Sequence, residues 1–221
     1  MKDLSITQEF LMCALNAKGK LPLDKNVISV CIIAGAIIEL LQNGDIQLEG
    51  NHIVATKDSK KDLSYLHSLL NEINVQDSIQ INKLLSQYVL TFTDKKIDLL
   101  ILDISHELVK KQYATKVSNG MFVKKERFIP NETGVDRIVE KIRAELLEEG
   151  CISEETIALV TLLDKSNLIK KYFSSHESKK LKERLKEIRS TSQNQLVKQM
   201  IEYVDTMMAT MTVILTSTVV N

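Results

Sequence analysis

The sequence contains few residues that interrupt helices. Among its 221 residues there are two prolines, Pro22 and Pro130, and seven glycines. Proline cannot continue an α-helix, and a glycine in a helix interior costs about 1 kcal/mol relative to alanine. The scarcity of both predicts a mainly α-helical protein. We expect one domain over residues 1–221, because the chain is long enough to bury a large core and no linker divides it.

Aromatic residues are also scarce, and neither sign of charge predominates. Tryptophan is absent, and there are five Phe and five Tyr, which argues against an aromatic platform for stacking single-stranded nucleic acid. Lys and Arg number 29, as do Asp and Glu, so the formal net charge is zero. No overall field therefore attracts the chain to nucleic acid or to a membrane, and any such affinity must come from local patches.

Motifs of common catalytic and nucleotide-binding sites are missing. The sequence has no G-x-S-x-G, no P-loop and no G-x-G-x-x-G. Adjacent carboxylates at 148–149 and 154–155 point apart on a helix, which fits solvated helix ends better than acid–base catalysis. No histidine has metal-ligand spacing to another His or to a Cys. We therefore predict no catalytic residue, no metal and no cofactor. The histidines are His52, His67, His106 and His176.

The three cysteines, Cys13, Cys31 and Cys151, are far apart and odd in number, so they do not suggest a disulfide framework. Cys13 and Cys31 lie in apolar helical runs, and we expect both to be buried, reduced thiols. Reduced thiols suit a cytoplasmic protein. The first residues also lack a secretory signal.

Two segments are apolar enough to be compared with membrane spans. Residues 27–41 carry one charge, Glu39, and residues 206–221 carry none. Both are shorter than the ~20 residues that a spanning helix needs. We predict that both are buried core helices.

Apolar spacing and capping signals predict a series of helices. Residues 5–16 begin with a capping-box spacing. Residues 27–42 are apolar on nearly every side, which is typical of a helix at the centre of a bundle, with Asn26 as the expected cap and Gly44 as the expected end. Further helices are predicted over residues 63–73, 78–89, 94–111, 133–150, 153–163, 179–189 and 193–219.

Two β-hairpins are predicted as well. Gly50-Asn51 lies between two short alternating runs within residues 46–55, and Asn119-Gly120 lies between two strand-like runs within residues 113–128. Asn-Gly favours the positive φ angles of a tight hairpin turn. The fold class is therefore a mainly α single domain with buried central helices and small β-hairpins.

The hairpin at residues 113–128 is the main candidate interaction surface. Glu126 is the one acidic residue between Lys110 and Arg127, against six Lys and Arg. Such a hairpin can contact an anionic membrane, where each cation contributes about 1 kcal/mol, contact a second subunit, or pack on its own helices. We slightly favour self-association, because the acidic segment 132–155 offers a counter-surface. The residues predicted to make the lipid or subunit contact are Phe122, Lys124, Lys125, Arg127 and Phe128.

A second basic run, residues 165–189, holds nine Lys or Arg against three Glu. A run of this kind is usually a solvated helix face. A binding surface is the alternative.

Taken in order, several segments resemble the Golgi phosphoprotein 3 family over nearly the whole chain. Residues 4–12 (LSITQEFLM) and 16–20 (NAKGK) resemble the family's first helix and the loop after it. Residues 35–40 (GAIIEL) and 43–49 (NGDIQLE) resemble its central helix and first hairpin. Residues 113–128 lie where the family has a projecting hairpin.

The resemblance implies a mainly helical domain, peripheral binding to phosphatidylinositol 4-phosphate on Golgi membranes, and recognition of membrane-enzyme tails for sorting. It also implies self-association through the projecting hairpin and no enzymatic activity.

The sequence departs from the eukaryotic members at their lipid pocket. Where those members have a tryptophan and three arginines, this chain has Asp24, Ile33, Asp98 and Ile101. None of these side chains can hold a phosphate as an arginine fork does. The arginine-bearing tail ahead of the first helix is also missing. The pattern suggests a prokaryotic-type member, for which the resemblance supports the fold more than the ligand.

The leading hypothesis is a non-catalytic module that binds anionic membrane lipid peripherally or takes part in protein sorting. The alternatives are an oligomeric interaction scaffold and a winged-helix-like regulator that binds nucleic acid. A helix over 27–42 followed by a hairpin over 46–55 resembles a winged helix. A recognition helix, however, needs polar and basic residues, and this one has almost none, so we do not expect nucleic acid as a partner.

Overall fold

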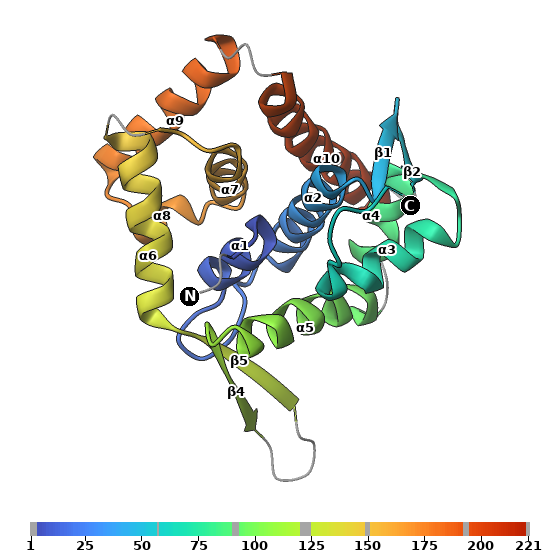
Figure 1. The fold of residues 1–221 in the computed structure, drawn as a ribbon, viewed down its shortest axis with the longest axis horizontal. Helices are drawn as coiled ribbons and strands as arrows, with labels where there is room; N and C mark the ends of the chain where they lie inside the picture. Colours follow the sequence, from blue (N-terminus) through green and yellow to red (C-terminus); the bar gives the residue numbers. More distant parts are fainter. Residues whose placement is uncertain are drawn as a thin grey trace.

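The computed structural model describes residues 4–56, 58–89, 93–119, 125–148, 151–191 and 195–219. Within these ranges, the side chains of residues 118, 119, 125, 191, 195–200 and 214–219 are not described. Helices make up most of the described chain, and two small antiparallel sheets accompany them (Figure 1). The prediction of a mainly α-helical fold with small hairpins is confirmed.

The elements are named in chain order, as labelled in Figure 1. They are α1 (Ile6–Ala14), α2 (Lys25–Asn43), β1 (Ile46–Glu49), β2 (His52–Ala55), the 3₁₀ turn η1 (Ser64–Leu66), α3 (His67–Asn74), β3 (Ser78–Gln80), α4 (Ile81–Val89), α5 (Lys95–Lys110), β4 (Ala114–Asn119), β5 (Lys125–Pro130), α6 (Glu132–Ile142), the π-helical turn η2 (Arg143–Leu147), α7 (Glu154–Lys165), α8 (Ile169–Tyr172), α9 (Ser175–Thr191) and α10 (Gln195–Val219).

Helix α2 occupies the centre of the fold, with α1, α4, α7 and α10 packed around it (Figure 1). Every residue from 28 to 40 is buried. Burial of one isoleucine side chain stabilises a fold by about 1.5–3 kcal/mol, so this helix contributes much of the core energy. By length and hydropathy α2 could cross a membrane, but 78% of its apolar window lies inside the protein. The core-helix prediction for residues 27–41 is confirmed.

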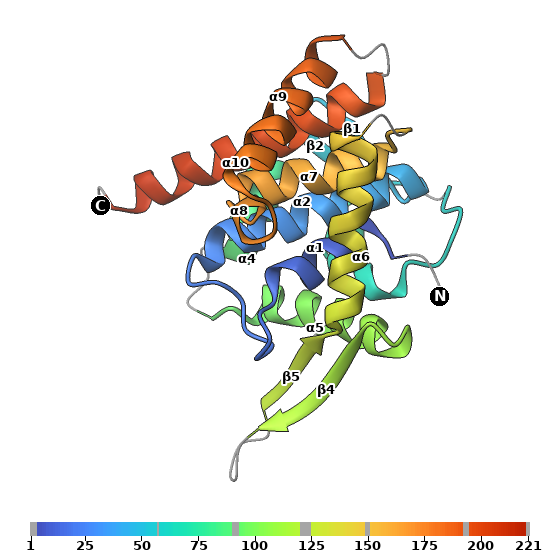
Figure 2. The ribbon, with the colours of Figure 1, turned by 90° about the vertical axis from the view of Figure 1, so that its left-hand side faces the viewer.

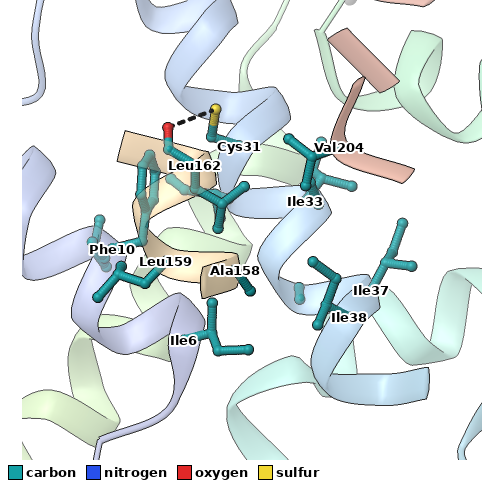
Figure 3. Close-up of a cluster of buried hydrophobic side chains, with 14 of the residues drawn as sticks. Ile6, Phe10, Cys31, Ile33, Ile37, Ile38, Ala158, Leu159, Leu162 and Val204 are labelled. Atoms are coloured by element: carbon teal, nitrogen blue, oxygen red, sulfur yellow. Dashed lines mark hydrogen bonds between the residues drawn. The ribbon is translucent and has the colours of Figure 1, made fainter. Parts of the chain in front are cut away.

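Side chains from four helices meet in the core beside α2. Figure 3 shows Ile6 and Phe10 of α1, Ile37 of α2, Leu159 of α7 and Val204 of α10 in one cluster. Cys13 and Cys31, the two thiols predicted to be buried, are free and buried. Burial raises the pKa of each to about 12, so neither is a reactive nucleophile. The Cys31 thiol donates a hydrogen bond to the Leu162 carbonyl at 3.7 Å (Figure 3).

The ends of α2 correct one prediction and confirm another. The helix begins at Lys25, and the Asp24 carboxylate accepts a hydrogen bond from the Val27 N–H at 3.4 Å. Asp24 is therefore the cap, and the prediction of Asn26 was wrong by two residues. At the other end Gly44 has a φ of 81°. A residue with a Cβ is strained in that conformation, so glycine suits this position.

The first hairpin forms as predicted, but a third strand joins it. β1 and β2 pair antiparallel, with Glu49 opposite His52, and β2 also pairs with β3. A helix was predicted to begin at residue 78. Instead Ile79 is buried opposite Ile53, and α4 begins only at Ile81. The open edge of β2 provides hydrogen-bond partners that no local pattern in the sequence reveals.

The second hairpin also forms. β4 and β5 pair antiparallel, from Ala114 with Pro130 to Asn119 with Lys125. Asn119, which was predicted to lie in the turn, is thus paired at the end of the described part of β4. Gly120 and the rest of the predicted turn lie outside the described residues.

The C-terminal half contains the remaining differences. The helix predicted over 133–150 ends as α6 at Ile142 and continues as η2, while α8 was not predicted. α10 follows the prediction closely. Its residues Met207 and Met211 are buried, as predicted, whereas Val213 is exposed, so the core prediction for 206–221 holds only for one face of the described part.

Candidate functional site

The hairpin β4–β5 leaves the helical body at its base, beside α5 (Figures 1 and 2). Its inner face is attached to that helix through His106. The His106 Nε2 lies 3.3 Å from the Glu126 carboxylate, and its ring meets the Phe128 ring edge-on at a centroid distance of 5.3 Å. Side chains alternate across a strand, so Glu126 and Phe128 face α5 and Arg127 faces away.

Of the five residues predicted to form one contact, Arg127 and Phe128 have described side chains, and these two lie on opposite faces of β5. Phe128 is buried against its own chain and Arg127 is half-buried. Lys125 is the first residue of β5, and its side chain is not described. Phe122 and Lys124 lie outside the described residues.

The root of the hairpin is also less cationic than its sequence indicates. The Lys116 ammonium lies 2.5 Å from the Glu126 carboxylate. This contact, together with the one from His106, holds the pKa of Glu126 below its usual range. Lys110 pairs with Glu107 at 3.2 Å. Lys116 of β4 and Lys110 at the end of α5 are thus partly neutralised by neighbouring glutamates.

A second projecting feature, the α1–α2 loop (residues 15–24), lies next to the hairpin. Its first turn is closed by Asn16, whose side-chain oxygen accepts hydrogen bonds from the N–H groups of Lys18 at 2.8 Å and Lys20 at 3.1 Å. The loop expected at residues 16–20 therefore forms as a tight turn. Leu23, farther along, is fully exposed. The loop thus combines exposed lysines with an uncovered leucine.

Two contacts hold the α1–α2 loop in place. Gly19 has a φ of 65° and lies so close to the hairpin that a Cβ there would come within 2.7 Å of the Phe128 carbonyl oxygen. On the other side the Lys171 ammonium donates to the Leu15 carbonyl at 2.9 Å. Burial lowers the pKa of Lys171. The loop is therefore wedged between β5 and α8.

The positions compared above with the eukaryotic lipid pocket hold two isoleucines and two aspartates. Ile33 is buried in α2 and Asp24 caps that helix. Asp98 and Ile101 line a hollow of about 20 Å³ near the start of α2, which is room for about one water molecule. The cation of that hollow, Lys25, pairs with Asp94 at 3.3 Å.

The second basic run of the sequence lies on α8 and α9, whose lysines surround an open hollow. Among the described residues, no group of three or more His, Cys, Asp or Glu is placed to hold a metal ion. The fold and these surfaces define a mainly helical protein with exposed basic and apolar features outside its core.

Comparison with known families identifies the class more closely. The sequence profile of the Golgi phosphoprotein 3 (GPP34) family matches residues 6–206. The match spans most of the chain, so the chain belongs to the Golgi phosphoprotein 3 family. None of the curated proteins compared shows significant similarity to this sequence.

Sequence reasoning did not single out the α1–α2 loop as a surface. The signal was present in Lys18-Gly19-Lys20-Leu21-Pro22-Leu23, where two leucines flank a proline directly after a basic turn. Leu21 packs against the core and Leu23 does not. Only the folded chain distinguishes them.

Proposed function

We propose that this protein is a non-catalytic peripheral module that binds anionic membrane surfaces through the α1–α2 loop, beside the hairpin β4–β5. The observation that carries the proposal is the full exposure of Leu23 on a loop that also presents Lys18 and Lys20. Transfer of a large apolar side chain from water into a lipid phase lowers the free energy of the system.

The charges around Leu23 suit an anionic surface. Neither Lys18 nor Lys20 forms an ion pair with any residue that the structure describes. A lysine close to an anionic leaflet contributes about 1 kcal/mol, and burial of a leucine contributes about 1.5–3 kcal/mol. The loop alone therefore supports weak, reversible binding. A second contact, from the hairpin or from another copy of the chain, would raise the affinity through avidity.

Selective binding of phosphatidylinositol 4-phosphate at the family's pocket is not part of this proposal. The hollow at that position is too small, and its residues include Asp94 and Asp98. The Asp98 carboxylate repels a phosphate, and the one cation that lines the hollow, Lys25, already pairs with Asp94. A surface mode, in which anionic charge matters more than head-group identity, agrees better with the residues present.

The alternative functions fit less well. A winged-helix regulator would insert α2 into a DNA groove, whereas α2 is buried among other helices. An oligomeric scaffold remains compatible with the hairpin, and in that case Leu23 would contact protein instead of lipid. Membrane-enzyme tail recognition, which the family resemblance implies, has no assigned surface here.

Vesicle flotation tests the proposal. The variant Leu23→Ser should lose most binding to anionic vesicles, and Val75→Ser is the matched control because Val75 is an exposed apolar residue at the end of α3. The double variant Lys18→Gln/Lys20→Gln should weaken binding mainly at low salt, since salt screens exposed charges over a Debye length of ~8 Å. Equal flotation of Leu23→Ser and Val75→Ser would refute the proposal, as would equal binding to neutral and anionic vesicles.

A further inference from the structure

An open hollow of about 500 Å³ lies between the end of α8 and one face of α9. Lys170 and Phe173 line it from the α8 side, and Lys179, Lys182 and Lys186 line it from α9. Residues three and four apart on a helix share a face, so the three lysines of α9 form one stripe. The hollow therefore gathers four ammonium groups from two elements that are adjacent in Figures 1 and 2.

These lysines are only partly neutralised. Lys182 pairs with Asp164 at 2.8 Å. Lys179 reaches Glu183, the one carboxylate that lines the hollow, only at 3.9 Å, and both side chains are largely exposed. For Lys170 and Lys186 the described part of the chain offers no ion pair or hydrogen bond.

A second hollow lies next to the first, and nearby carboxylates neutralise the basic residues that belong to it alone. It shares Lys182 and Lys186 with the first hollow and continues along α9. Its other cations, Lys165 and Arg189, both pair with Asp205, at 2.5 and 2.6 Å. Close ion pairs thus neutralise the cations on one side of the shared lysines, whereas on the other side Glu183 is the one carboxylate in the lining.

Phe173, the aromatic residue that lines the hollow, is fixed by a contact with Arg143. Phe173 is buried, and the Arg143 guanidinium lies over its ring at 5.3 Å from the centroid. Arg143 belongs to the π-helical turn η2 and is itself held by Glu177 at 2.8 Å and Glu140 at 2.7 Å. This part of the lining is therefore preformed and does not depend on a ligand to order it.

We infer that this hollow is a binding site for a phosphate monoester, with Lys170 and Lys186 as the main contacts. A phosphate monoester carries about −1.5 to −2 charges at pH 7, which matches two unpaired ammonium groups. A phosphodiester carries one charge and lacks the terminal oxygens that several lysines can share. The monoester can belong to a lipid head group or to a soluble phosphate, and the chemistry of recognition is the same for both.

The experiment uses the full chain and two probes. One is vesicles in which phosphatidic acid, a monoester lipid, replaces phosphatidylglycerol, a diester lipid, at matched surface charge. The other is inorganic phosphate, followed by ³¹P NMR. The site variant is Lys170→Gln/Lys186→Gln. The control is Lys83→Gln/Lys180→Gln, which removes the same charge from exposed lysines outside the hollow.

Loss of charge-assisted hydrogen bonds to two lysines should lower affinity for the monoester probe by about tenfold or more. If the site variant loses the preference for phosphatidic acid and the control variant keeps it, the inference is supported and the bound monoester belongs to a lipid. Binding of inorganic phosphate without any such preference supports the site with a soluble ligand. If neither probe separates the site variant from the control, the inference is wrong. Leu23→Ser should leave binding of inorganic phosphate intact, so failure of the membrane proposal and failure of this one are distinguishable.

Discussion

The Glu39 carboxylate of α2 accepts a hydrogen bond from the backbone N–H of Thr7 at 2.5 Å. Thr7 is the second residue of α1, where the N–H groups have no partner inside the helix and the helix dipole favours an anion. The other carboxylate oxygen accepts from the Tyr65 hydroxyl at 2.6 Å. The single charge among the buried residues of α2 thus joins three segments of the chain, and burial raises the pKa of Glu39.

This raised pKa predicts a pH-dependent stability. Because the folded protein holds the Glu39 proton more tightly than the unfolded chain, with its ordinary value of 4.5, the contribution of this group is full below pH 4.5 and is lost as pH rises through the folded pKa. The free energy of unfolding of the wild type, minus that of Glu39→Gln, should therefore decrease as pH rises from 4.5. Urea unfolding over a pH series measures it. A flat difference between the wild type and Glu39→Gln over this pH range would contradict the assignment.

The core of α2 predicts a large loss of stability on truncation. Ile37 is fully buried, so Ile37→Ala should lower the free energy of unfolding by about 2–5 kcal/mol through lost burial and a cavity. Ile37→Asp should prevent folding, because an unpaired buried carboxylate cannot be accommodated. Urea unfolding followed by circular dichroism measures the first, and soluble yield with far-UV spectra measures the second. Val75→Ala, at an exposed position, should leave the free energy of unfolding within ~0.5 kcal/mol of the wild-type value. An equally small change in Ile37→Ala would contradict the burial of Ile37.

The hairpin predicts a change in assembly. Deletion of residues 118–125 removes the end of β4, the connection and the first residue of β5, and leaves Phe128 in its contact with His106. We expect the mass in solution to fall, with the wild-type contact surviving high salt because apolar burial dominates such an interface. Light scattering at two salt concentrations measures the mass, and vesicle co-sedimentation shows whether lipid binding changes with it. Unchanged mass and unchanged lipid binding would mean that the hairpin only packs on its own helices.

The family's lipid pocket predicts a negative result. Binding of phosphatidylinositol 4-phosphate should be no stronger than binding of other anionic lipids at equal surface charge, because Ile33 and Ile101 supply no donor and Asp98 adds a negative charge. Surface plasmon resonance on vesicles of matched charge measures the preference. Saturable, selective binding that is abolished by mutation near Asp98 would show that the hollow opens to admit the head group.

Several features could be predicted from local sequence because local chemistry decides them. Gly44 ends α2 since only glycine adopts its φ without strain, and Ser153 caps α7 by accepting a hydrogen bond from the Thr156 N–H at 3.2 Å. The all-round apolar pattern of α2 predicted a central helix, and α2 is central. Family membership followed from segments spread along the chain, and the match over residues 6–206 confirms it.

Other features depend on contacts between segments far apart in the chain. Residues 78–80 form a strand because β2 offers an open edge to them. Phe128 became a packing residue because His106, on α5, lies under that face of β5. Neither partner can be identified from periodicity, since these contacts form only once the chain has folded.

The candidate sites show the same division. The sequence alone determined the helical class, the buried central helix and the absence of recognisable catalytic motifs. Tertiary structure decided which charges are neutralised, because an ion pair such as Lys182 with Asp164 requires two helices to meet. It also decided which apolar residues remain in water. Leu21 and Leu23 are two positions apart and chemically identical, yet only Leu23 is left without a neighbour to cover it.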